Sequence, residues 1–134
     1  MKKLLIVFIF PLFFACSNSE DNMETVMNEK EEVINPFVMG DFISRAHPTS
    51  GKAAVSSDKT KLAFTNFRTD NGPKLLVYLS TDENSTEFVN LGDLKGIQGD
   101  FTYNVPTNTD FRKYKLVNIW CVDFSVSFGT AELK

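Results

Sequence analysis

Cys121 is the residue of this chain best suited to chemistry. The chain has two cysteines and one histidine, and Cys121 lies in an apolar run beside the only tryptophan, Trp120. A thiol can exchange electrons or bind a soft metal or haem iron. A free cysteine among apolar neighbours can equally serve as a small core residue. Two interpretations therefore stay open for Cys121, a redox or ligand thiol and an inert packing group.

His47 is the second candidate, because it precedes Pro48 in a predicted turn. If the fold brings His47 near Cys121, the two would form a thiolate and imidazole pair that suits copper, zinc or haem iron. Met39 could add a thioether, although a methionine in a strand more often fills a core. A lone histidine in a turn is commonly a cap or a surface residue.

No second cysteine accompanies Cys121 in a C-x-x-C pattern, which excludes dithiol exchange of the thioredoxin kind and covalent haem attachment. No glycine-rich phosphate loop opens onto a helix, and no oxyanion element is recognisable. An electron carrier or a binding module is therefore favoured over an enzyme with turnover.

The other cysteine, Cys16, ends a basic and then apolar N-terminal segment. Its apolar run of about 11 residues is too short for a membrane-spanning helix and is typical of a secretory signal. Ala15 before Cys16 resembles the cleavage box of bacterial lipoproteins. We expect a signal peptide over residues 1–15 and a lipid anchor on Cys16, which attaches the protein to a membrane. Ordinary signal cleavage, which would leave Cys16 free, is the alternative.

Residues 16–36 are acidic and contain no aromatic side chain before Pro36. Such a segment buries too little apolar surface to fold, so it is predicted to be a flexible tether with a reach of about 25 Å. An acidic segment after a lipidated cysteine also resembles the surface-export signals of some Gram-negative lipoproteins. We therefore expect the bacterial cell envelope, with the outer membrane as the anchoring surface.

Residues 37–134 contain all seven glycines and equal numbers of acidic and basic side chains. The absence of a basic stripe gives no support to a nucleic-acid partner. Apolar residues alternate with a period of two, and turn signals recur about every ten residues. Eight strands are expected, over 37–45, 52–56, 61–67, 75–79, 88–91, 101–105, 114–122 and 126–133. This pattern predicts an all-β domain, an antiparallel β-sandwich or a small barrel.

Within the strand that carries Cys121, alternation places Val117, Ile119 and Cys121 on one face. Asn118 falls on the other face among apolar residues, so it needs a hydrogen-bond partner or an edge position. In the segment 68–73, which contains the turn before the 75–79 strand, Arg68 and Asp70 are expected to pair with each other, and the alternative is that the loop presents Arg68 to an anionic ligand.

Several motifs in order give the chain a family resemblance from about residue 40 to residue 133. They include Gly40-Asp41-Phe42, Asn66-Phe67-Arg68-Thr69-Asp70-Asn71-Gly72-Pro73, Leu91-Gly92-Asp93-Leu94, Tyr103-Asn104-Val105-Pro106 and Ile119-Trp120-Cys121. These residues resemble the DM-thirteen domain, a secreted module that also occurs beside cytochrome-like DOMON domains. The resemblance implies an electron-transfer role, a cytochrome-like redox partner, and Cys121 as the family's signature cysteine, acting as a redox thiol or as a ligand for a prosthetic group.

Two functions from different classes remain open. In the first, the domain is a membrane-tethered redox module that acts through Cys121, with His47 assisting. In the second, it is a non-catalytic binding domain of the envelope, and Cys121 packs beside Trp120, Phe124 and Phe128.

Overall fold

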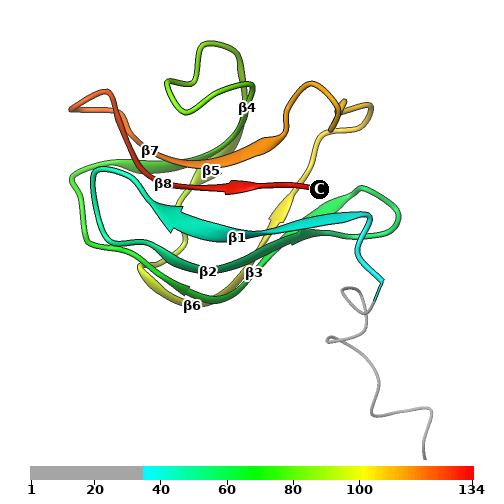
Figure 1. Ribbon diagram of the computed structural model, residues 1–134, viewed down its shortest axis with the longest axis horizontal. Helices are drawn as coiled ribbons and strands as arrows, with labels where there is room; N and C mark the ends of the chain where they lie inside the picture. The colour runs from blue at the N-terminus through cyan, green and yellow to red at the C-terminus, as the bar shows by residue number, and fades with distance from the viewer. Residues whose placement is uncertain (1–34) are drawn as a thin grey trace, which may run out of the picture.

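The computed structural model describes residues 35–134, which fold as eight antiparallel β-strands (Figure 1). The strands are β1 (Val38–Ser44), β2 (Ser50–Val55), β3 (Lys61–Arg68), β4 (Leu75–Ser80), β5 (Phe88–Asp93), β6 (Gln98–Asn104), β7 (Leu116–Cys121) and β8 (Val126–Glu132). Within this part of the chain no helix has the length and hydrophobicity needed to cross a membrane. The expected all-β class is confirmed, because every predicted strand overlaps an observed one.

The strands form one sheet in the order β5-β4-β7-β8-β1-β2-β3-β6. The sheet curls into a nearly closed barrel, and Figure 1 shows β1, β2 and β3 wrapping beneath β8 and β7. No ladder joins the terminal strands β5 and β6, so the barrel has a seam between them. Of the two predicted architectures, the small barrel is the one observed.

Alternate residues of each strand fill the barrel, as the period of two requires. Phe42, Phe64, Phe67 and Tyr103 pack ring against ring, with centroids 5.0 Å apart in each contact. β4 is buried along its whole length, because its outer side chains are also covered. The core therefore needs no disulfide to hold it together.

Antiparallel order brings four turns to the same end of the barrel. They connect β1 to β2, β3 to β4, β5 to β6 and β7 to β8, and we call this end the Cys121 end because Cys121 closes β7 there. His47 lies in the first of these turns and Asp70 in the second. The topology thus gathers residues that are more than seventy positions apart in sequence.

Candidate functional site

Cys121 is a free cysteine whose side chain is 0% exposed in the barrel core. Val117 and Ile119 share its face and are equally buried, which confirms the predicted alternation of the strand. In the sheet Cys121 lies between Leu75 of β4 and Val126 of β8. The thiol is therefore out of contact with solvent in this conformation.

A β-bulge next to Cys121 shapes this end of the barrel. Ile119 pairs with Gly129 and Trp120 pairs with Ser127, so Phe128 has no opposite residue on β7. Bulges redirect side chains and bend the strand that carries them. Here the ring of Phe128 enters the core, and its outer side stacks on the ring of His47 at a centroid distance of 3.8 Å.

His47 is bound to Asp70, which is a partner that the sequence did not suggest. Its Nδ1 lies 3.0 Å from Asp70 Oδ2, across two turns of the Cys121 end. The expected pairing of Arg68 with Asp70 is wrong, because the Asp70 carboxylate faces the β1–β2 turn instead. The pairing of β2 with β3, which sets Ser50 opposite Arg68, brings positions 47 and 70 together, and the alternation pattern alone does not give this register.

Two buried threonines support the same junction. Thr49 Oγ1 lies 3.0 Å from Thr69 Oγ1 and donates to the backbone oxygen of Phe128 or His47, each 3.1 Å away. These contacts join the β1–β2 turn to the β3–β4 loop and to β8. The position of His47 over Phe128 is therefore fixed by the backbone of three segments.

The described residues do not assemble a site for haem or a soft metal. Cys121 and His47 occupy the same end, yet no hydrogen bond joins them, and Met39 lies near the opposite end of β1. Residues 35–134 contain no group of three or more His, Cys, Asp or Glu side chains placed to hold an ion. Cys121 is enclosed by core side chains, which leaves no room for a macrocycle. The predicted ligand pair does not fit either group.

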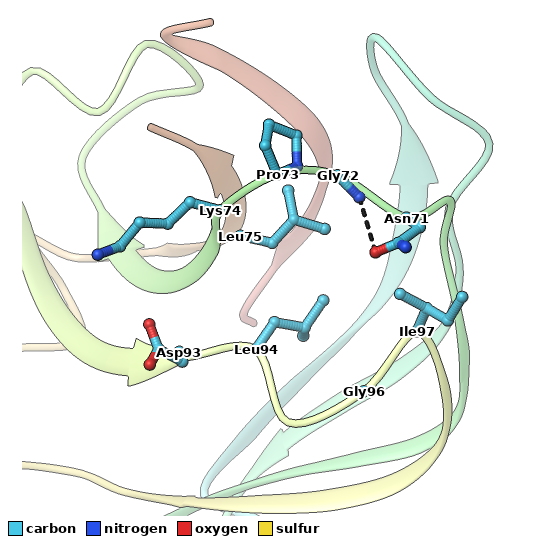
Figure 2. Close-up of a pocket in the computed structure, with 9 residues that line it drawn as sticks. All are labelled: Asn71, Gly72, Pro73, Lys74, Leu75, Asp93, Leu94, Gly96 and Ile97. Atoms are coloured by element: carbon cyan, nitrogen blue, oxygen red, sulfur yellow. Dashed lines mark hydrogen bonds between the residues drawn. The ribbon is translucent and has the colours of Figure 1, made fainter. Parts of the chain in front are cut away.

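A surface hollow of about 440 Å³ lies beside the seam at the Cys121 end (Figure 2). It is formed by residues 71–75 of the β3–β4 segment, by Asp93 at the end of β5, and by Leu94, Gly96 and Ile97 after it. Leu75, the sheet partner of Cys121, lines this hollow, and Leu94 donates its backbone N–H to the oxygen of Leu75 at 2.9 Å. Figure 2 shows Leu75 and Leu94 extending into the space between the two segments. Solvent in this hollow therefore contacts β4, the strand next to the one that carries the thiol.

On the outer face of β7, Asn118 is fully buried and satisfied by hydrogen bonds. Its Nδ2 donates to the oxygen of Glu83 at 3.0 Å and to Ser85 Oγ at 2.9 Å, while Ser127 Oγ donates to its Oδ1 at 2.5 Å. The requirement that Asn118 find partners is confirmed. The amide fastens the β4–β5 loop, residues 81–87, onto the sheet.

Asp82 organises that loop, and its ionisation predicts a pH dependence. Hydrogen bonds from Thr86, side chain first and backbone second, hold the pKa of Asp82 below its ordinary value of 3.8. A carboxyl with a lowered folded-state pKa adds stability above its unfolded pKa and loses it as pH falls through the folded pKa. We expect Asp82→Ala to destabilise the domain at pH 7 and the difference from the wild type to shrink as the pH falls below the ordinary value of 3.8. Urea titrations of both proteins between pH 7 and pH 2 measure this difference, and a difference that did not decrease with falling pH would contradict the assignment.

The lipidation candidate Cys16 lies outside the described residues. Comparison with protein-family models finds a match over residues 41–133, to the family described as Electron transfer DM13. No curated protein and no solved structure matches the chain. The matched segment runs from β1 through β8 and includes Cys121 and His47.

Proposed function

The chain belongs to the Electron transfer DM13 family, and from this membership we propose that its β domain is a redox module of the bacterial cell envelope. The family match, which spans nearly the whole barrel, is the observation that carries the proposal. The basic and apolar start of the chain and the Ala15-Cys16 pair support export and a lipid anchor on Cys16. The electron partner in this proposal is a cytochrome-like or thiol-active protein at the same membrane.

Cys121 is the group that we assign to the redox step. Its thiolate would attack one sulfur of a partner disulfide, so that a mixed disulfide forms, the partner's S–S bond breaks, and the leaving sulfur departs as a thiolate that takes up a proton. The side chain is buried, so the step requires the Cys121 end to open locally. The hollow lined by Leu75 and Leu94 offers one approach, because Leu75 is a direct neighbour of Cys121 in the sheet.

A binding domain with a structural cysteine is the second candidate, and one observation favours it. The side chain of Cys121 is 0% exposed and belongs to the continuous core. A small apolar group at this position would serve packing equally well. The two candidates differ in whether the folded domain exposes the thiol on an accessible timescale.

Thiol titration of the native and the unfolded chain separates these candidates. For a redox module we expect an aromatic disulfide reagent to label Cys121 in the folded protein. An opening free energy of about 4 kcal/mol would slow the labelling about 1000-fold relative to the unfolded chain. The reaction is followed by absorbance and by mass, and Cys121→Ala supplies the background from Cys16. If Cys121 were labelled only as fast as the whole domain unfolds, a rate measured in parallel by circular dichroism, the thiol would have the structural role and not the redox one.

A further inference from the structure

A second hollow of about 460 Å³ lies on the outer surface of the barrel. Three segments form its walls: the end of β1, the β4–β5 loop, and the β7–β8 hairpin. The side chains that matter for its chemistry are Arg45, Glu83, Asn84, Trp120, Ser125 and Ser127. This volume is in the range of small-molecule sites, and the lining combines one aromatic ring with several hydrogen-bonding groups.

The ring of Trp120 is held in place by a stack that crosses three strands. Tyr78 of β4 stacks on Trp120 with centroids 6.3 Å apart and an interplanar angle of 22°. Phe88 of β5 stacks on Tyr78 at 4.1 Å and 8°. Because Tyr78 supports the indole from the β4 side, the hollow meets it from the β8 side, where the bulge sets Ser127 opposite Trp120. A ring fixed in advance loses little conformational entropy when a ligand binds.

The charged groups of the hollow favour an uncharged ligand rich in hydroxyls. Arg45 and Glu83 form an ion pair at 2.9 Å, and Arg45 Nε also donates to Thr130 Oγ1 at 3.1 Å. The lining therefore holds one cation and one anion that neutralise each other, and an ionic ligand would meet a like charge. A hydroxyl can donate to a carboxylate and accept from a guanidinium, so it can use both members of the pair.

The polar wall is also preformed. The hydrogen bonds from Asn118 to the Glu83 backbone and to Ser85 hold the loop, and Asp82 Oδ1 accepts the backbone N–H groups of Asn84 and Thr86. The aromatic wall and the polar wall thus come from separate, individually anchored segments.

We propose that this hollow binds a neutral sugar, a pyranose unit of a glycan. The C–H face of a pyranose carries partial positive charge and matches the negative face of an indole. The ring hydroxyls would bond to Arg45, Glu83 and the serines at its edge. This site does not depend on Cys121 and would operate whether or not the thiol is redox-active.

Fluorescence of the intact chain tests the proposal directly, because Trp120 is its only tryptophan. The chain, kept in a polyoxyethylene detergent so that no detergent sugar competes, is titrated with maltotriose, cellotriose, mannotriose and tri-N-acetylchitotriose. We expect a saturable change in emission with at least one of them. Glu83→Ala should weaken that binding about tenfold or more. Trp120→Ala should weaken it by a similar factor, and its binding is measured by calorimetry because this variant has no tryptophan fluorescence.

Phe124→Ala is the matched control, since Phe124 is 68% exposed in the same hairpin and is absent from the lining of the hollow. It should bind as the wild type does. No saturable response to any of the four sugars would overturn the proposal, as would binding that survives both Glu83→Ala and Trp120→Ala in proteins with a wild-type circular dichroism spectrum. Because Glu83 is on the surface, loss of folding is not expected to obscure the result of Glu83→Ala.

Discussion

Replacement of Gly40 by alanine is expected to destabilise the barrel by about 3 kcal/mol or more, a fall in Tm of about 12–24 °C for a domain of this size. A Cβ at position 40 would lie 1.9 Å from the backbone oxygen and 2.7 Å from the carbonyl carbon of Glu132. These are main-chain atoms of β8, so no side-chain rotation relieves the contact. Differential scanning calorimetry and urea titration measure the loss.

The reason lies in how β1 joins the two parts of the barrel. Its residues up to Asp41 pair with β2, and those from Phe42 onward pair with β8. A glycine inside a strand often marks a tight bend at a barrel corner. Gly40 lies just before the change of partner, where its Cα faces the backbone of Glu132 in β8. An added methyl group would push β8 away from β1 and strain the closure.

Gly92→Ala is the control for this prediction. Gly92 has a φ of +104°, which disfavours alanine, but a Cβ there would meet no atom within 4 Å. Backbone strain alone should cost about 1–2 kcal/mol. The explanation fails if Gly40→Ala destabilises the domain less than Gly92→Ala does.

The strands were predictable because their signal is local. Alternation of apolar residues places Val117, Ile119 and Cys121 on one face, and the structure buries all three. The same alternation exposed the conflict at Asn118, and the general rule that buried amides are bonded predicted its outcome. The alternation could not identify the hydrogen-bond partners of Asn118, which lie in the β4–β5 loop and on β8.

The candidate sites were less predictable, because they depend on which strands become neighbours. His47 meets Asp70 only because β1–β2 and β3–β4 turn at the same end of the barrel. Tyr78 stacks between Trp120 and Phe88 only because β4 lies between β5 and β7 in the sheet. Sequence separation says nothing about either contact. The family resemblance identified Cys121 as a candidate residue, but only the structure of the barrel shows that its side chain is buried.

Asn118→Leu is expected to cost about 3 kcal/mol, because it removes three hydrogen bonds from a site that is 0% exposed. Leucine has a similar size, so little of the cost would come from a cavity. Most of it would come from the desolvation of the groups that lose their Asn118 partner, the Glu83 carbonyl and the Ser85 hydroxyl, while Ser127 Oγ keeps a long hydrogen bond to the Gly129 oxygen at 3.4 Å. Urea titration measures the loss, and exchange of the loop amides should accelerate together with it.

Asn104→Leu separates this effect from the general cost of replacing an asparagine. Asn104 is exposed and accepts one hydrogen bond from Lys61, so its replacement should change stability by less than about 0.5 kcal/mol. If Asn118→Leu were equally mild, the buried amide would not be what holds the loop. If instead it released the loop, the Arg45–Glu83 pair would lose its fixed geometry, and sugar binding would weaken although no residue of the hollow had been changed. The stability of the barrel and the outer binding surface are therefore coupled through one buried side chain.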